Sequence, residues 1–471
     1  MLIRNAEIAG LGRTHLRIEA GRIAAIGDGL RPGEHEAVLE AGGGALLPGL
    51  HDHHIHLLAL AAALDSVPCG PPQVHDAGQL ARTLTLKAAE TQATSGDDWL
   101  RGTGYHESVA GDIDRHWLDR VVPDRPLRIQ HRSGRLWILN SRALERLGAE
   151  DDGDAPLERI AGQASGRLYD ADAWLRQRLG SRPPSLARVG RLLASHGVTG
   201  VTDTSQHNGP QELAHFAAEQ ARGHLLQAVL AMGDARLDGA LPSGDVRPGH
   251  FKVHLHENEL PPFDALCEDI RRRHAAGRNV AFHCVTLTEL VFACAALEAA
   301  GVDTGTFAGD RIEHASVAPP ETLPQLAALG LVVVTQPNFI RERGDVYLRE
   351  VEAADLPWLY RARGLLDAGI PLAAGTDAPY GDPNPWLALE AAVTRKSASG
   401  RILGAAEALS PEQALALFTS PARQPGGPVR RLAVGAPADL CLLDRPWADA
   451  RERLGAVHVR ATWRTGKMIW Q

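Results

Sequence analysis

The sequence predicts an α/β fold in which eight parallel strands and their helices close into a (β/α)8 barrel of the TIM type. Apolar, strand-like runs recur along the chain, and most are followed by segments with helical periodicity. The length of 471 residues also suits a large barrel with additions. A small β-sandwich formed by both chain ends, and an α/β subdomain inserted after the first barrel strand, complete the prediction.

Both ends of the chain have the pattern of short antiparallel strands. Residues 2–8 alternate apolar with polar side chains, and residues 438–443 near the other end have a similar strand-like pattern. Neither end is long enough to bury a core alone. We therefore expect residues 1–48 and 428–471 to form one composite β-sandwich.

The barrel itself is assigned to residues 49–66 and 190–427. Its strand-like runs are 45–50, 198–204, 225–231, 251–256, 279–284, 311–315, 331–336 and 371–377. Helical patterns follow at 262–276, 289–300 and 357–368. Strands that alternate with helices indicate a parallel sheet, and eight such units indicate closure.

One interval breaks the alternation. Roughly 140 residues separate the first run from the second, which is too long for a single crossover connection. This interval contains a strand-like run of its own at 127–131. Residues 67–189 are therefore predicted to be an inserted subdomain that lies over the barrel mouth.

Composition narrows the functional classes. The net charge of -8 argues against nucleic-acid binding, which needs a basic face. The five cysteines are odd in number and form no CxxC pair, so a reducing cytoplasm is the simpler location. No signal-like N-terminus or membrane-length apolar run occurs. We expect a cytoplasmic enzyme with a small-molecule substrate, which a homodimer would suit, and no membrane partner.

Two histidines near the first run predict a metal site. In His54-Ile55-His56 the two imidazoles are two positions apart, so on a strand they point to the same face. They would lie about 6–7 Å apart, and neutral imidazole is the commonest metal ligand. A histidine-rich surface turn is the alternative, because His51 and His53 crowd the same segment.

Three further side chains strengthen the metal prediction because each ends a strand-like run. They are His283, His314 and Asp377. In a barrel the carboxyl ends of the strands converge on the active site. The nitrogen and oxygen donors suit Zn²⁺, with Mn²⁺ or Fe²⁺ as alternatives, as one ion or two. For Asp377 a helix N-cap is the competing interpretation.

Lys252 lies in the fourth strand-like run, which is apolar, and a lysine is rarely buried in such a strand without a partner or a function. A salt bridge or an extended stem would explain it. A more specific reason is carbamylation by CO₂, which turns the amine into a carboxylate that bridges two metals. His254 and His256 share the face of Lys252, so either imidazole is an alternative ligand or a substrate contact.

This order of ligands resembles the binuclear pattern of the amidohydrolase superfamily. The matching positions are His54, His56, Lys252, His283, His314 and Asp377. Further sequence segments resemble those of amidohydrolase family 3, the group that contains N-substituted formamide deformylases. They lie at 99–105, 122–126, 137–144, 311–315, 375–379 and 435–440. The resemblance implies a metal-dependent hydrolase that acts on carbon–nitrogen bonds other than peptide bonds.

The resemblance breaks where pocket-facing residues are expected. Ser133-Gly134-Arg135 stands where the family often has Asp-Gly-His, and His256-Glu257 stands where it often has Asp-Gly. Val285-Thr286 replaces a usual Gly-Asp pair. The resemblance therefore implies the family's reaction class for this protein, but it does not imply the substrate.

The ligands predict the mechanism. A metal lowers the pKa of its bound water to about 7 and polarises the substrate carbonyl, so a metal-bound hydroxide attacks. Asp377 accepts the proton and passes it to the leaving amine. Candidate substrate contacts are Tyr105, His131, Arg132, Arg135, His254 and His256. An arginine among them would bind a carboxylate through its planar fork.

Two other functions compete with amide hydrolysis. Hydrolytic deamination of a heterocycle uses the same metal chemistry, usually with a glutamate near the fifth-strand histidine. Here Glu289 lies six residues after His283, without a close His-x-x-Glu pair, which lowers this alternative. A non-catalytic, ligand-binding barrel is disfavoured by the intact ligand set.

Overall fold

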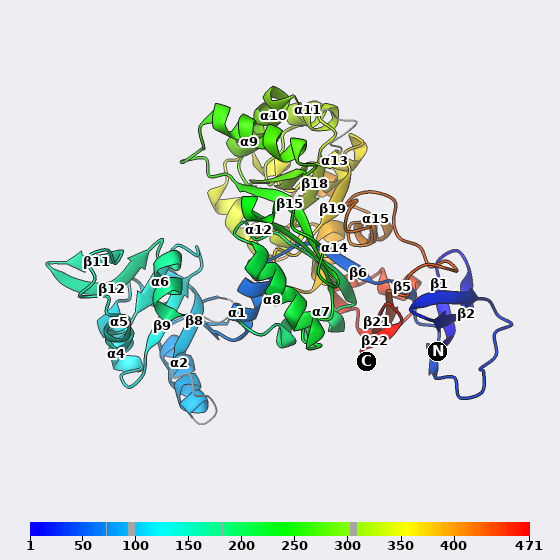
Figure 1. Ribbon diagram of the computed structural model, residues 1–471, viewed down its shortest axis with the longest axis horizontal. Coiled ribbons are helices and arrows are strands. Elements are labelled where there is room, and N and C mark those ends of the chain that lie inside the picture. The colour runs from blue at the N-terminus through cyan, green and yellow to red at the C-terminus, as the bar shows by residue number, and fades with distance from the viewer. Residues whose placement is uncertain (72, 93–98, 181–182, 302–308) are drawn as a thin grey trace. The chain divides into compact units, whose positions relative to one another are not determined.

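The computed structural model describes residues 1–71, 73–92, 99–180, 183–301 and 309–471 (Figure 1). The chain divides into two compact units. The larger unit contains Met1–Leu57 and Ser185–Gln471, and the smaller unit is Leu58–Pro184. Among the described residues, no helix has the length and apolar character needed to cross a membrane.

The larger unit is built around an eight-stranded parallel sheet that is nearly closed. Its strands, in spatial order, are β6 (Leu50–Ile55), β13 (Val198–Asp203), β14 (Ala228–Gly233), β15 (Val246–His254), β16 (Val280–Cys284), β17 (Arg311–His314), β18 (Val332–Thr335) and β19 (Leu372–Ala374). The segment after β19 meets β6, because Asp377 N donates to the His54 carbonyl at 2.7 Å and His56 N donates to the Ala378 carbonyl at 2.9 Å. This confirms the (β/α)8 barrel.

Helices lie outside the barrel strands (Figure 1). They are α7 (Ala187–Ser195), α8 (Pro210–Ala221), α9 (Phe263–Ala275), α10 (Leu287–Ala300), α11 (Leu323–Ala328), α12 (Asn338–Glu350), α13 (Ala362–Asp367), α14 (Pro385–Thr394) and α15 (Pro411–Ala416). Helix α10 shows how the sequence sets their ends. Thr286 and Glu289 form a capping box at its start, and Gly301, with φ 72°, ends it.

Two predicted elements of the barrel have wrong boundaries. The run 45–50 belongs to two sheets, because β5 (Leu46–Pro48) pairs with β20 (Leu440–Leu443) and β6 begins only at Leu50. The chain changes sheets at Gly49, where a Cβ would lie 2.3 Å from Thr199 Cγ2. The helix expected at 357–368 is a 3-10 turn, Leu356–Trp358, followed by α13. Tyr360, with φ 48°, separates the two.

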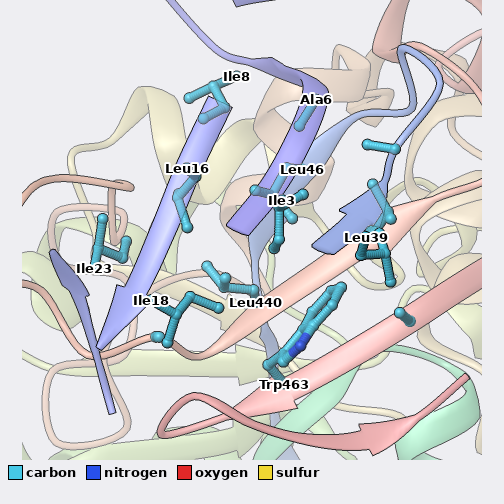
Figure 2. Close-up of a cluster of buried hydrophobic side chains, with 14 residues drawn as sticks. Ile3, Ala6, Ile8, Leu16, Ile18, Ile23, Leu39, Leu46, Leu440 and Trp463 are labelled. Carbon is cyan, nitrogen blue, oxygen red and sulfur yellow. The ribbon is translucent and has the colours of Figure 1, made fainter. Parts of the chain in front are cut away.

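Two four-stranded sheets are formed from the two ends of the chain. One has the order β3 (Arg22–Ile26), β2 (Gly12–Glu19), β1 (Leu2–Ile8) and β4 (Val38–Glu40). The other has the order β22 (Lys467–Trp470), β21 (Val459–Arg464), β20 and β5. Their side chains share one buried apolar cluster, in which Ile3 and Leu16 meet Leu440 and Trp463 (Figure 2). Burial of this cluster joins the two ends.

The smaller unit has a mixed sheet and its own helices. The sheet order is β11 (Leu157–Ile160), β12 (Gln163–Tyr169), β10 (Leu136–Leu139), β9 (Leu127–His131), β8 (Leu100–Tyr105) and β7 (Val67–Pro68). The helices are α2 (Ala77–Gln92), α3 (Glu107–Ala110), α4 (Arg115–Val121), α5 (Ser141–Leu147) and α6 (Asp172–Leu179), with α1 (Leu57–Leu64) at the boundary of the two units. Two apolar clusters give this unit a core of its own.

The remaining short elements lie in the larger unit. They are α16 (Trp447–Ala450) and the 3-10 turns Ala235–Leu237, Pro320–Thr322, Ala405–Glu407 and Leu454–Ala456.

Candidate metal centre

Three buried side chains from strand ends converge at the barrel mouth. His54, His314 and Asp377 each offer one ligand atom, and these atoms lie within 4.8 Å of one another. Asp377 Oδ1 is 3.4 Å from His54 Nε2 and 3.2 Å from His56 Nε2. His54 comes from β6, His314 ends β17, and Asp377 follows β19. The structure therefore brings three of the predicted ligand histidines, His54, His56 and His314, together around the Asp377 carboxylate.

The backbone at this site adopts conformations that L-residues rarely take. His314 has φ 71° and Asp377 has φ 56°, both in the left-handed region. Each residue lies where its strand ends, so the chain turns sharply there. Such strain commonly marks functional positions and persists only where surrounding contacts hold it. At Asp377 one such contact is the hydrogen bond from its N–H to the His54 carbonyl.

His283 and His254 lie beside these ligands on neighbouring strands. Register pairs His254 with His283 and His283 with Glu313, so all three side chains share one face of the sheet. His283 Nδ1 is 2.9 Å from His314 Nε2. The ring centroids of His254 and His283 are 4.0 Å apart. His256 stacks on His254 at 4.5 Å and is exposed.

Each of three histidines predicted to be ligands has one ring nitrogen engaged by a neighbouring polar side chain. His54 Nδ1 is 2.5 Å from Glu313 Oε2, and His314 Nδ1 is 2.6 Å from Gln336 Oε1. His56 Nδ1 is 3.1 Å from Ser205 Oγ. These contacts fix the ring orientations. They turn the Nε2 atoms of His54 and His56 toward Asp377 Oδ1, and the Nε2 atom of His314 toward His283 Nδ1.

Sequence reasoning did not identify these orienting partners. Glu313 carried a signal, because Arg311 and Glu313 are charged residues two positions apart in an apolar strand. Arg311 Nε donates to Glu313 Oε1 at 2.7 Å, and both side chains are fully buried. Gln336 and Ser205 carried no comparable signal.

The pKa shifts of Asp377, His314 and His283 suit metal binding. The pKa of His54 is raised instead, because burial lowers it less than the carboxylates of Asp377 and Glu313 raise it. Burial would raise the pKa of the Asp377 carboxyl, but the histidines beside it hold that pKa well below its usual range. Burial lowers the pKa of His314 to about 3, so its imidazole is neutral. Burial also lowers the pKa of His283. Neutral imidazole and ionised carboxylate are the forms that ligate divalent metals.

Lys252 is a buried side chain whose polar atom needs an explanation, and carbamylation, which would turn its amine into a carboxylate, would supply one. It lies on β15, is only 6% exposed, and its Nζ has no hydrogen-bond partner among the described residues. Burial lowers its pKa to about 8. Asp377 Oδ1 also has no hydrogen bond within the part of the chain that the structure describes. Buried polar atoms normally have partners, so this donor set fits a divalent metal.

His51 and His53 are separated from the ligand pair. His51 Nε2 is 3.0 Å from Thr202 Oγ1, and His53 Nε2 is 3.1 Å from Ser420 Oγ. Both rings are buried, which excludes the histidine-rich surface turn that was the alternative for this segment.

The remaining predicted substrate contacts lie in the smaller unit. The Tyr105 hydroxyl is in the core of that unit and donates to the Gly111 carbonyl at 2.5 Å. His131 Nε2 is 3.2 Å from Glu107 Oε2. Arg135 makes a two-pronged contact with Asp170, at 2.7 and 2.6 Å.

A hollow of about 360 Å³ brings two of these residues together. Its lining includes His131 and Arg135, together with Glu107, Ser133 and Asp170. Arg132 is exposed beside it in sequence. The roles of Tyr105, His131, Arg132 and Arg135 as substrate contacts stay predictions.

Comparisons with known proteins agree with this geometry. The sequence pattern described as "Amidohydrolase family" matches residues 37–470. N-substituted formamide deformylase of Arthrobacter pascens is 26% identical, over 96% of this chain and 94% of the relative. Putative amidohydrolase YtcJ of Bacillus subtilis (strain 168) is 24% identical, over 91% and 89%.

Two solved structures share the fold. An uncharacterized metal-dependent hydrolase from Pyrococcus horikoshii has a TM-score of 0.75 at 20% identity, covering 97% of this chain and 99% of that one. A second, from Pyrococcus furiosus, has a TM-score of 0.71 at 20% identity, covering 94% and 98%. With a family match over most of the sequence and a barrel whose strand ends present histidines and an aspartate, the chain belongs to the amidohydrolase family of hydrolases, which act on carbon–nitrogen bonds.

Proposed function

We propose that this protein hydrolyses an amide-type carbon–nitrogen bond of a small molecule, with Asp377 as general base and then general acid. The convergence of His54, His314 and Asp377 at the barrel mouth carries the proposal. The substrate classes to test first are N-formyl and N-acyl compounds and cyclic amides. The formamide deformylase from Arthrobacter pascens, which is similar over most of its length, makes N-formyl compounds the first choice.

The proposed metal ligands are His54, His56, Lys252, His283, His314 and Asp377. Zn²⁺ is the ion proposed, as one ion, or as two if Lys252 is carbamylated. When bound, a divalent metal supplies Lewis acidity toward the carbonyl and activates water at neutral pH. The unpartnered Nζ of Lys252 supports its place in this set.

Asp377 has the properties that a proton shuttle needs. Its carboxyl is ionised at neutral pH, because the surrounding histidines hold its pKa low. Its backbone N–H is anchored on the His54 carbonyl, so Oδ1 stays between the two Nε2 atoms of His54 and His56. Oδ1 accepts the proton of the attacking water and returns it to the leaving nitrogen.

Deamination of a heterocycle has less support. Both carboxylate oxygens of Glu289 are engaged, since Oε2 accepts from Val285 N at 2.7 Å and Oε1 accepts from Glu257 N at 3.1 Å. Glu289 therefore closes the start of α10 and holds the loop after β15. That structural role explains the residue without proton transfer to a ring.

The test is a substrate screen with metal-replete protein. Purified protein should contain one to two equivalents of transition metal by elemental analysis, and it should release formate or another carboxylate together with an amine. Protein that contains no transition metal would sink the proposal. Release of ammonia from heterocycles, with no amide turnover, would replace it with deamination.

A further inference from the structure

The barrel has a seam between its first and last strands, β6 and β19. A ladder of hydrogen bonds joins every other pair of neighbouring strands, whereas no ladder joins β6 to β19 among the described residues. His54 lies on β6 and Asp377 lies just after β19, so the two residues face each other across this seam. The contacts that close the seam therefore set the position of one residue relative to the other.

The two backbones approach closely at the seam. At Gly375 a Cβ would lie 2.3 Å from the backbone nitrogen of His54, so a larger residue would force the strands apart. The backbone hydrogen bonds from Asp377 N to the His54 carbonyl and from His56 N to the Ala378 carbonyl lie just beyond the end of β19. At the level of Gly375 the connection is made by a side chain instead.

That side chain is Asp52, which is fully buried. Its Oδ1 accepts hydrogen bonds from Thr376 N at 3.0 Å and from His54 N at 3.1 Å. Its Oδ2 accepts from the Thr376 hydroxyl at 2.5 Å. One carboxylate on β6 thus holds the backbone of a predicted metal ligand and the residue that precedes Asp377.

The same network holds Asp377 from both sides. The Thr376 hydroxyl, which donates to Asp52, also accepts from Ala378 N at 3.3 Å. Asp377 itself has φ 56°, a conformation that persists only where neighbouring contacts enforce it. Without Asp52, the buried N–H groups of His54 and Thr376 would lose their acceptor, and an unsatisfied buried donor is costly. The two sides of the seam would then be free to shift.

We propose that Asp52 is a positioning residue that sets the distance between His54 and Asp377 across the barrel seam. Asp52 acts through the two backbone segments that it joins. The inference rests on the proposed function, because it takes His54 as a metal ligand and Asp377 as the general base. Displacing reacting groups by about 1 Å can lower a rate by about 100-fold, so a clamp at this position has a measurable effect.

The first test measures metal binding without any substrate. Co²⁺ is the probe, because it accepts the same nitrogen and oxygen ligands as Zn²⁺ and its visible absorption depends on ligand geometry. Asp52→Ala should weaken Co²⁺ binding by about 10–100-fold in competition with a chelator and should change the absorption of the bound ion. Asp52→Asn should stay close to wild type, since its amide oxygen accepts both N–H groups and its nitrogen donates to the Thr376 hydroxyl.

Asp310→Ala is the matched control. Asp310 is 1% exposed and accepts from Val280 N at 2.8 Å, but it lies at the amino ends of β16 and β17, away from the barrel mouth. Its loss should lower the thermal unfolding midpoint, as the loss of Asp52 does, without changing the affinity for Co²⁺ or the spectrum. Equal effects of Asp310→Ala and Asp52→Ala on Co²⁺ would overturn the proposal, because general loosening of the barrel would explain both.

The Thr376 side of the clamp gives a milder pair of variants, which decides the question if Asp52→Ala does not fold. Thr376→Val removes the hydroxyl and should weaken Co²⁺ binding by about fivefold, as expected for one hydrogen bond. Thr376→Ser keeps the hydroxyl and should bind Co²⁺ as wild type does. Folded Thr376→Val protein with wild-type affinity and spectrum would overturn the proposal.

Turnover of an N-formyl substrate provides the second readout. Asp52→Ala should lower kcat by about 100-fold with little change in KM, and Asp52→Asn should restore most of the rate. Wild-type protein that binds no Co²⁺ would overturn the proposed function together with this inference. Wild-type protein that binds Co²⁺, with Asp52→Ala equal to it in affinity, spectrum and kcat, would overturn this inference alone.

Discussion

Two groups of histidines with a carboxylate can be compared within the described residues, and one of the two resembles a metal centre. At the barrel mouth, His54 and His314 have ring centroids 4.7 Å apart and face Asp377. In the smaller unit, His106 and His131 stack at 6.0 Å, and Glu107 lies 3.2 Å from His131. The residue types are alike, so the difference lies in their surroundings.

Burial and the origin of the hydrogen-bond partners separate the two groups. The His54 side chain is 1% exposed and its Nδ1 is held by Glu313, which is 259 positions away in sequence. The His131 side chain is 13% exposed, with Glu107 45% exposed, and its Nδ1 is 2.8 Å from Ser133, two positions on. A partner from another strand fixes a ring before any ligand binds, whereas a turn partner moves with it.

Replacing the carboxylate of each group should give the largest difference between the two groups. Asp377→Asn should lower turnover by about 10⁴-fold, because the amide neither accepts the proton nor returns it. Metal content should stay largely intact, because the amide oxygen of asparagine still offers a ligand atom and the histidines are unchanged. Glu107→Gln, the matched change in the smaller unit, should leave metal content at the wild-type level. Unimpaired turnover by Asp377→Asn would remove its role as base.

Lys252→Ala tests whether Lys252 is a metal ligand. The group of His106, His131 and Glu107 in the smaller unit has no lysine in this role. Loss of a ligand should lower metal affinity by more than the 10–100-fold expected for loss of an orienting partner. The second metal ion should therefore be lost. Added formate or acetate should partly restore turnover by replacing the missing carboxylate. Elemental analysis before and after addition checks this, and normal metal occupancy in the variant would show that Lys252 is not a ligand.

Gln336→Ala tests whether the partner from another strand matters. It removes the acceptor for His314 Nδ1 and should weaken metal binding by about 10–100-fold. Ser133→Ala removes the corresponding partner of His131 and should not change metal affinity. Competition with a chelator measures both. If both changes altered metal affinity equally, an orienting partner from another strand would not distinguish the barrel-mouth group from the group in the smaller unit.

The smallest expected effect is the pH dependence of metal loading. Lys252 has its pKa lowered to about 8 in the metal-free protein, so its amine becomes neutral as pH rises through that value. Only the neutral amine reacts with CO₂. Below pH 8 the loading rate at fixed CO₂ pressure should rise about tenfold per pH unit, and it should level off above. Stopped-flow loading with Lys252→Ala as control measures this, and a flat profile would count against carbamylation.

The barrel was predictable because its strands are apolar on both faces, as in β18, where all four residues are buried. The boundary at Gly49 was not. Residues 45–50 form one uninterrupted apolar stretch, and only pairing with β20, near the other end of the chain, shows that it serves two sheets. The predicted domain boundaries and the placement of the inserted subdomain stay predictions.

The site was predictable in part for a similar reason. His54, His314 and Asp377 lie at or just after the carboxyl ends of their strands, and that position can be recognised from the local pattern. Gln336 and Ser205 are single polar residues whose importance depends on which strand lies next to which. Local periodicity contains no information of that kind, so orienting partners need the structure.

The apolar cluster shared by the two sheets from the ends of the chain has a consequence for biosynthesis. During synthesis, Ile3 and Leu16 emerge early, while the residues that cover them, Leu440 and Trp463, emerge only after the whole barrel. The first sheet therefore lacks the cover for its apolar side until the barrel has been synthesised. A chain that stops after the barrel therefore leaves that surface without its cover.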